Sequence, residues 1–403
     1  MEVPRPTEEA LRRLRETSRQ LASEWRAALG RSETVPLWQA AREMIRKHGQ
    51  KLYGPAYDSL RVEPLTSADA KVKCFLKAEK WEVPHGNALK TPRAIQFRGP
   101  RYNLVLSKYL MPLEHNLYPY LNNLEENSSG CFSSKGLTPN QRAELIVGLW
   151  GKYARPAAIC LDHSRWDAHC SPGALRAEHT MYGMLCGGSP RELRWLLSMQ
   201  VRNSGTGVHG TRYRLEGSRM SGDVNTALGN TILNAAVLRS ALGPKAPLFS
   251  ILVEGDDGVI FGEREEVLAL ATQLPARVLE YGFELKTSVA REVEEIDFCS
   301  SRVLTAEVAL SVRQLYKPFV TDLWTAKPVS GERAMGEKAY TMACGFWHLY
   351  RGLPLYQAWA EYLLSHCAGR NYDPWYDREL TLRMRAVAEA SAPTVVTLAA
   401  RVS

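Results

Sequence analysis

The sequence predicts an α+β fold, in which helices pack against a sheet of short strands. Three observations support this class. Strand-like and helix-like segments follow one another in the middle of the chain in the order strand, helix, hairpin, helix, strand. Hydrophobic residues make up 45% of the 403 residues and charged residues 23%, which is ordinary for a globular protein. No internal repeat or low-complexity tract interrupts the pattern.

The first part of the chain is predicted to be mostly helical. Apolar residues at helical spacing indicate an amphipathic helix over residues 7–29, and helical patterns return over 104–124 and 139–153. Between them, residues 70–103 are rich in Lys and Arg, are broken by prolines and predict short strands and loops. The apolar run 157–162 predicts a buried strand that ends on an aspartate.

The second part of the chain carries the predicted hairpin. The elements expected there are a helix over 224–242, strands over 249–254 and 258–261, a helix over 263–281, a strand over 283–286 and mostly helices beyond 305. The tripeptide Gly255-Asp256-Asp257 joins the two central strands, so the hairpin is predicted to have an acidic tip. We expect the helices to cover one face of the sheet.

Charge and cysteine content narrow the classes of partner and compartment. The net charge is +8, and basic residues cluster in runs such as 98–101, which fits a polyanionic partner or a solvated basic surface. The eight cysteines include no CxxC pair, which favours a reducing, intracellular setting. The longest apolar run, near 248–253, is far too short to span a bilayer. We therefore expect no transmembrane segment and membrane association only through a partner.

Three aspartates carry the clearest chemical signal. Asp256 and Asp257 are adjacent at a predicted turn, where two like charges are unfavourable unless a cation neutralises them. A sheet would bring Asp162, at the end of its own strand, beside this turn and complete a site for two Mg²⁺ ions. Asp167 lies five residues further on, where it could reach an incoming ribose. The alternative is that these residues are ordinary turn residues at the surface.

A glycine-containing turn followed by polar side chains lies between these aspartates. In the segment 217–230, Ser221, Thr226 and Asn230 offer donors and acceptors to a sugar hydroxyl or to a template backbone. Helix capping by Ser221 or Asp223 is the alternative, and both roles are compatible. Capping alone does not explain Thr226 and Asn230 one turn apart on one face.

These segments resemble the conserved motifs of viral RNA-dependent RNA polymerases. Residues 162–169, Asp-His-Ser-Arg-Trp-Asp-Ala-His, look like motif A, Ser221 to Asn230 like motif B, and Gly-Asp-Asp at 255–257 like motif C. The Arg-Met-Ser-Gly-Asp-Val-Asn-Thr string at 219–226 is similar to that of tombusvirus and tombus-like polymerases. Trp166 replaces the family's usual Phe, and Glu254 stands where Asn or Cys is commoner.

The resemblance also assigns residues outside these three motifs. Residues 73–103 resemble motif F, so Lys73, Lys77, Lys90 and Arg93 would bind the nucleoside triphosphate, and Arg98 and Arg101 would bind RNA. Lys286 resembles the motif D lysine that donates a proton to pyrophosphate. Ser300 and Arg302 lie in a segment like motif E, which grips the primer strand, and Gly222 of motif B would contact RNA. Lys135-Gly136 also resembles the family, without a defined role.

The family resemblance implies a right-hand polymerase fold of fingers, palm and thumb, with a ferredoxin-like antiparallel palm sheet. The expected divisions are 1–69 for an N-terminal extension and fingers, 70–156 for fingers with motif F, 157–303 for the palm with motifs A to E, and 304–403 for the thumb. Residues 168–215 would belong partly to the fingers. The resemblance covers roughly residues 70–320.

The expected function is RNA-directed RNA synthesis that replicates a positive-strand RNA virus genome with two Mg²⁺ ions, for which Mn²⁺ can substitute. Partners would be template and nascent RNA, nucleoside triphosphates and a viral replication protein that recruits the chain to membrane-bound complexes in the host cytoplasm. A reverse transcriptase-like enzyme is the first alternative, although Asp167, Ser221 and Asn230 offer partners to a ribose 2′-hydroxyl. A non-catalytic basic RNA-binding protein is the second, but it leaves the three aspartates unexplained.

Overall fold

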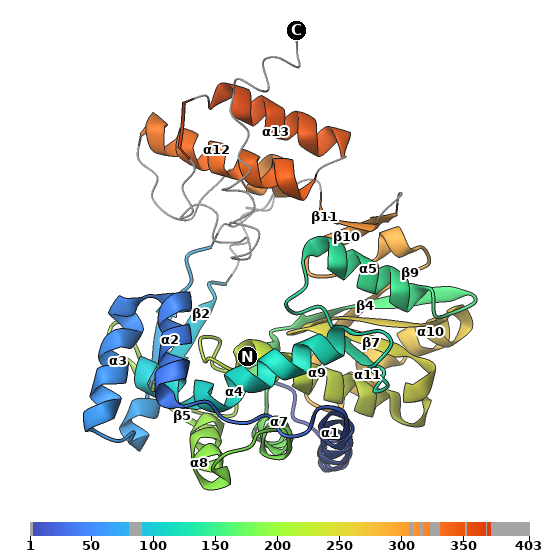
Figure 1. Ribbon diagram of the computed structural model, residues 1–403. Coiled ribbons are helices and arrows are strands. Elements are labelled where there is room, and N and C mark those ends of the chain that lie inside the picture. Colours follow the sequence, from blue (N-terminus) through green and yellow to red (C-terminus); the bar gives the residue numbers. More distant parts are fainter. Residues whose placement is uncertain are drawn as a thin grey trace. The chain divides into compact units, whose positions relative to one another are not determined.

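A five-stranded sheet is the largest sheet among the described residues of the computed structural model (Figure 1). Its strands, in spatial order, are β3 (Cys131–Ser133), β7 (Ser250–Glu254), β8 (Asp257–Glu263), β4 (Pro156–Ser164) and β9 (Glu284–Ala290). The last four pair antiparallel in a βαββαβ connection, which is the ferredoxin-like arrangement. β3 is parallel to β7, so the expectation of a wholly antiparallel sheet is corrected. β3 is joined to the rest of the sheet by a long connection that contains a helix, and parallel pairing requires such a crossover.

Helices cover both faces of this sheet, whereas we expected them on one. They are α9 (Thr226–Leu242), α10 (Arg264–Ala271) and α11 (Leu274–Leu279) on one face and α5 (Pro139–Trp150) on the other. Along β4, Ile159 and Leu161 pack with the first group, while Ala158 and Cys160 pack with α5. Because alternate side chains of a strand point to opposite faces, burial on both sides explains why β4 is a continuous apolar run.

α9 is the most deeply buried helix of the larger unit. Fourteen of its seventeen residues are buried, among them the polar Asn230, Thr231 and Asn234. The helix ends at Gly243, whose φ of 57° suits a residue without a Cβ atom. α1 (Glu8–Leu29) packs against α9, and Thr7 caps it by accepting a hydrogen bond from the Ala10 amide. A helix this enclosed is a rigid support for the residues it carries.

A second sheet of four strands lies in the same unit. Its order is β2 (Ala94–Arg98), β1 (Val72–Leu76), β5 (Arg202–Gly207) and β6 (Arg212–Glu216), with β1 parallel to β5 and the other pairs antiparallel. The other helices of the unit are α2 (Leu37–His48), α3 (Gln50–Val62), α4 (Pro100–Asn122), α6 (Trp166–His169), α7 (Pro172–Leu185) and α8 (Pro190–Val201). Short 3₁₀ helices span Ser67–Ala70, Gly243–Leu248 and Val293–Glu295.

The structure describes residues 3–79, 91–305, 309–314, 317–322, 331–350, 353–367 and 369–371. The chain divides into two compact units, Met1–Lys77 with Pro92–Ser311, and Ala78–Thr91 with Val312–Ser403. A two-stranded sheet of β10 (Ser301–Thr305) and β11 (Ala309–Arg313) lies at the chain boundary between them. The five-stranded sheet, the four-stranded sheet and the helices α1 to α11 belong to the first unit.

The second unit is mainly helical where it is described, as expected for residues beyond 305. It contains a short π-helix, Lys317–Thr321, and the helices α12 (Glu332–Leu349) and α13 (Pro354–His366). Cys344 and Leu364 are fully buried where these two helices pack together. Across both units, no helix that the structure describes has the length and apolar character needed to cross a membrane.

Candidate active site

Four charged residues form a row across one end of the five-stranded sheet. Glu254 on β7 pairs with Asp257 on β8, and Asp162 on β4 pairs with Lys286 on β9. The neighbouring pair Leu161–Gly258 places Asp162 and Asp257 next to each other. All four residues fall on the α5 face, since each is an even number of residues from a side chain that packs there. The strand end and the hairpin tip predicted separately from the sequence therefore meet.

The carboxylates of this row and of the neighbouring Asp256 affect one another electrostatically. Desolvation, followed by the charge of Asp256, raises the pKa of Asp257 to about 6. Desolvation also raises the pKa of Asp256, and the charge of Asp162 adds to this effect. The charges of Asp162 and Asp256 thus disfavour the ionised form of Asp257, and a cation would relieve that repulsion.

These oxygen donors fit the expected Mg²⁺, which prefers carboxylates and retains several waters. In the conformation seen here, no three acidic, histidine or cysteine side chains among the described residues are gathered closely enough to hold a metal ion. Asp162, Asp256 and Asp257 therefore supply suitable donors without forming a closed ligand cluster. An ion bound here would draw on them together with water or substrate oxygens.

Two polar side chains of α9 form hydrogen bonds with the backbone of the acidic turn at residues 255–257. The Gly255 amide donates to the Thr231 hydroxyl at 2.9 Å, and the Asn234 amide donates to the carbonyls of Gly255 and Asp256, both at 3.2 Å. The Asn234 oxygen lies 3.2 Å from Nε2 of His163, next to Asp162. Burial lowers the pKa of His163 to about 4, so its ring is neutral and Nε2–H donates to Asn234. The side-chain amide of Asn234 thus forms hydrogen bonds both with His163, near the end of β4, and with the turn at Gly255 and Asp256.

Asp167 and Asn230 are in direct contact, as their expected shared role requires. The Asn230 amide donates to the Asp167 carboxylate at 3.0 Å, and the Asn230 oxygen accepts from Arg219 Nε at 2.9 Å. Arg219 in turn forms a buried ion pair with Glu178 of α7. Burial raises the pKa of Asp167, while the hydrogen bond from Asn230 opposes the shift. Sequence reasoning missed Arg219 and Glu178, because the interior of α7 carries no local sign of a distant partner.

The turn before α9 is attached to strand β2 by backbone contacts. Ser221 Oγ accepts a hydrogen bond from the backbone N–H of Gln96 at 3.2 Å, and the backbone N–H of Gly222 donates to the backbone carbonyl of Gln96 at 2.7 Å. A Cβ atom at Gly222 would lie 2.6 Å from Cβ of Phe97, so the strand leaves no room for a side chain. Gly222 is therefore required for close packing, in addition to any contact with RNA.

The hydroxyl of Thr226 is directed back to its own turn. It donates to the Met220 carbonyl at 2.9 Å and so closes the loop that precedes α9. This bond gives Thr226 a structural role in the turn, and its expected contact with substrate stays a prediction. A local hydrogen bond of this kind is common for Thr at the start of a helix.

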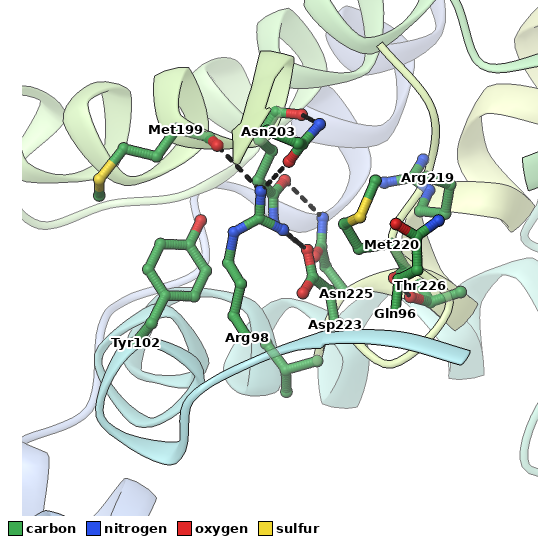
Figure 2. A network of polar contacts seen from close by, with 12 residues as sticks. Gln96, Arg98, Tyr102, Met199, Asn203, Arg219, Met220, Asp223, Asn225 and Thr226 are labelled. Atoms are coloured by element: carbon green, nitrogen blue, oxygen red, sulfur yellow. Dashed lines mark hydrogen bonds and ion pairs between the residues drawn. The ribbon is translucent and has the colours of Figure 1, made fainter. Parts of the chain in front are cut away.

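Arg98 has a structural role rather than the expected contact with RNA. It is 1% exposed, and its guanidinium pairs with Asp223, donates to the Met199 carbonyl at 2.9 Å and donates to Asn203, as Figure 2 shows. Its charge also lies 5.2 Å from the centre of the Tyr102 ring. All of these partners are protein groups, so Arg98 joins the second sheet to the turn before α9.

Arg101 is likewise engaged by the protein. Its Nε donates to Asp69 at 2.8 Å, and its terminal nitrogens donate to the hydroxyl of Ser59 and to the carbonyls of Glu63 and Pro64. These bonds fasten the start of α4 to the end of α3. We therefore correct the expected RNA contact of Arg101 to a structural one.

The structure describes three of the four basic residues that were predicted to bind triphosphate. Lys73 and Lys77 are exposed at and beyond β1, and Lys90 lies outside the described residues. Desolvation raises the pKa of both Asp167 and Asp256, and the positive charge of Arg93 partly opposes this rise, which places Arg93 within electrostatic reach of both carboxyl groups. Among the described members of this group, Arg93 is the residue whose charge acts on carboxyl groups of the site.

A tight turn borders the acidic row near Asp257. Phe298 and Ser301 exchange backbone hydrogen bonds of 3.0 and 3.1 Å, and Cys299 and Ser300 between them have φ values of 52° and 58°. A hydrogen bond from the Cys299 side chain to Asp257 opposes the rise in the pKa of that aspartate. Ser300 and the nearby Arg302 are exposed and free to meet a ligand from solvent.

Comparison with known proteins identifies the family. A family model described as viral RNA dependent RNA polymerase matches residues 1–403. Relatives named RNA-directed RNA polymerase come from Tobacco necrosis virus (strain A), 36% identical over 63% of this chain and 35% of the relative, and Turnip crinkle virus, 32% identical over 80% and 40%. A third, from Tomato bushy stunt virus (strain Cherry), is 36% identical over 63% of this chain and 31% of the relative.

The fold and the acidic site place the chain in a class of viral polymerases. The chain belongs to the viral RNA-dependent RNA polymerase family, and its relatives confirm the predicted likeness to tombusvirus polymerases. It spans between 31% and 40% of the length of these curated relatives.

Proposed function

We propose that this chain catalyses RNA-directed synthesis of RNA and replicates the genome of a positive-strand RNA virus. The observation that carries the proposal is the meeting of Asp162 with the Gly255-Asp256-Asp257 turn in a member of this polymerase family. A basic RNA-binding protein would need neither the paired strand end and turn nor the buried supports beneath them.

The proposed reaction forms one bond and breaks one. The 3′-hydroxyl oxygen of the growing strand bonds to the α-phosphorus of a nucleoside triphosphate, and the bond from that phosphorus to pyrophosphate breaks. Two Mg²⁺ ions, or Mn²⁺ in their place, would supply charge stabilisation for the attacking and leaving oxygens. Asp162, Asp256 and Asp257 would hold these ions. Lys286, opposite Asp162, would donate a proton to the departing pyrophosphate.

Selection of ribose would depend on the contact between Asp167 and Asn230. Their carboxylate and amide lie 3.0 Å apart and leave acceptor and donor capacity for a 2′-hydroxyl. Ser221 and Arg93 border the same region and would contact the sugar and the triphosphate, with Lys73, Lys77 and Lys90 along the entry path. Ser300, Arg302 and Gly222 remain the proposed contacts to RNA.

The family implies a right-hand architecture, within which we assign the five-stranded sheet to the palm. The proposed divisions are an N-terminal extension and fingers over 1–69, fingers over 70–156, palm over 157–303 with 168–215 partly in the fingers, and thumb over 304–403. The motif A segment 162–169 runs from the end of β4 through α6, the motif B segment 221–230 from the preceding turn into α9, and motif C lies at the turn between β7 and β8. The divisions follow the order of motifs along the chain.

We further propose that template and nascent RNA are the macromolecular ligands and that a viral replication protein recruits the chain to membrane-bound complexes in the host cytoplasm. The basic charge of +8 supports the RNA part of this proposal. The relatives' names support it as well, since each is an RNA-directed RNA polymerase of a plant virus.

Incorporation of labelled ribonucleotides on a short RNA template with Mg²⁺ or Mn²⁺ tests the proposal. We expect template-dependent product from the wild type, none from Asp256→Ala and little from deoxynucleotides. Equal activity in Asp256→Ala would remove the catalytic assignment. Equal use of deoxynucleotides would favour the reverse transcriptase-like alternative, and binding without incorporation would favour the non-catalytic one.

A further inference from the structure

Glu254 is the carboxylate of the row that was not among the predicted metal ligands, and its side-chain partners lie on a different part of the chain. It is the last residue of β7 and faces Asp257 across the turn. Its carboxylate accepts a hydrogen bond from the Ser134 hydroxyl and lies 3.6 Å from Lys135 Nζ and 3.4 Å from Arg142 Nη2. The side chains of Glu254 and Arg142 are 18% and 17% exposed, so their ion pair is shielded from solvent, whereas Lys135 is 42% exposed.

A carboxylate at this position is unfavourable unless it is neutralised. The charge of Glu254 is among the groups that raise the pKa of Asp257, so the two anions repel each other. Left free, Glu254 would also compete with Asp257 for a cation, because both offer the same hard oxygen donors. Lys135 and Arg142 bring two positive charges to one negative charge and so reduce both the repulsion and the competition.

The partners of Glu254 are themselves fixed in place. Ser134 directly follows β3, which is paired with β7, and it is 1% exposed. The Lys135 carbonyl accepts from the Asn122 amide at 3.2 Å, and its backbone N–H donates to the Ser133 hydroxyl at 3.3 Å. Arg142 lies in the first turns of α5, whose start is closed by a capping box of Thr138 and Gln141. The segment 133–142 is therefore held in place by its own strand pairing, hydrogen bonds and helix cap.

Resting on the proposed polymerase function, we propose that Glu254 is a positioning residue. Its contacts with Ser134, Lys135 and Arg142 tie the end of β7 to the segment before α5 and so fix where Asp256 and Asp257 stand. Glu254 is saturated by these partners and does not bind the catalytic cation. Lys135, which the sequence marked without a role, acts as the neutralising group together with Arg142.

Steady-state incorporation kinetics on a primed RNA template test this role. We expect Glu254→Ala to lower kcat by about tenfold or more, because small displacements of reacting groups are costly, and to change KM for the nucleotide little. Glu254→Gln keeps an acceptor for Ser134 but loses both ion pairs, so its kcat should be intermediate. Combining Glu254→Ala with Lys135→Met and Arg142→Met should cost no more than Glu254→Ala alone, since all three remove the same contact.

Controls separate this inference from general damage and from the proposed function. Glu266→Ala removes an exposed ion pair with Lys245 far from the row and should leave kcat unchanged. Mn²⁺ binding followed by electron paramagnetic resonance should be weakened by Asp256→Asn and retained in Glu254→Gln, as expected if Glu254 is no ligand. Thermal unfolding of each variant identifies any that fail to fold, in which case Ser134→Ala takes the place of Glu254→Ala.

Three results would overturn the inference. These are a wild-type kcat in Glu254→Ala, losses that add in the combined variant, or loss of Mn²⁺ binding in Glu254→Gln equal to that in Asp256→Asn. Each of these results counts against the role of Glu254 only when Asp256→Ala is inactive, which shows that the proposed function holds. If Asp256→Ala is instead as active as the wild type, the proposed function fails and the role of Glu254 falls with it.

Discussion

Replacing Arg98 by Met tests whether this basic residue supports the fold or binds RNA. The Arg98 and Asp223 side chains are 0% and 3% exposed, so Met removes the charge but keeps much of the volume. Removing one partner of a buried ion pair costs about 3–5 kcal/mol, because the other charge stays buried and unpaired. Here the loss also leaves Asn203 and the Met199 carbonyl without a donor. We therefore expect the free energy of unfolding of Arg98→Met to fall by that amount.

Chemical denaturation measures this loss, and RNA affinity as a function of salt separates the two roles. A residue that contacts a single-strand phosphate contributes about 0.7 to the slope of log affinity against log salt. Arg98→Met should keep the wild-type slope, and Arg98→Met with Asp223→Leu should regain much of the lost stability. The exposed Arg214→Met serves as a control with unchanged stability. An unchanged unfolding midpoint together with a reduced salt slope would refute the structural role.

Three further perturbations follow from contacts described above. Gly222→Ala places a Cβ atom 2.6 Å from that of Phe97 and should destabilise the protein by about 1–3 kcal/mol in denaturant titrations; an unchanged midpoint would show that the turn can shift. Asn234→Ala removes three hydrogen bonds under the acidic turn and should lower kcat by about tenfold or more with little change in KM, which nucleotide-incorporation kinetics would reveal or contradict. Burial raises the pKa of Glu114 from 4.5 to about 7, so the folded state binds a proton more tightly and stability falls as pH rises from 4.5 to 7. Glu114→Gln should abolish that fall and stabilise the protein at pH 8 by at most about 3 kcal/mol, whereas parallel stability profiles for both proteins would contradict the assignment.

The sequence sufficed to predict the centre of the site because its signals are local. An apolar run that ends on Asp162 and a Gly-Asp-Asp turn between two short strands each predict their own geometry. Once both belong to one sheet, strand pairing brings them together. A shared role of Asp167 and Asn230 at the ribose was predicted from the motif resemblance, and the structure adds the direct contact between them, which the sequence did not predict.

Burial and partners distant in sequence could not be predicted in the same way. Arg98 and Asp223 are 125 residues apart, and an arginine in a basic segment looks the same whether it faces solvent or a buried carboxylate. Glu178 gives no sign within α7 that it will meet Arg219, 41 residues later. β3 was missed because three residues carry no periodic pattern, and its parallel pairing depends on a crossover.

The polar residues of α9 have a consequence for substrate discrimination. Asn230, Thr231 and Asn234 lie within little more than one turn of a helix that is enclosed on all sides. The first touches the proposed ribose-binding aspartate, while the other two hold the turn that carries the catalytic aspartates. In the proposed reaction, a sugar that displaces Asn230 would therefore also displace Asp256 and Asp257. Misincorporation would then be slowed by misalignment of the reacting groups as well as by weaker binding, so the proposed function predicts that accuracy and speed depend on the same helix.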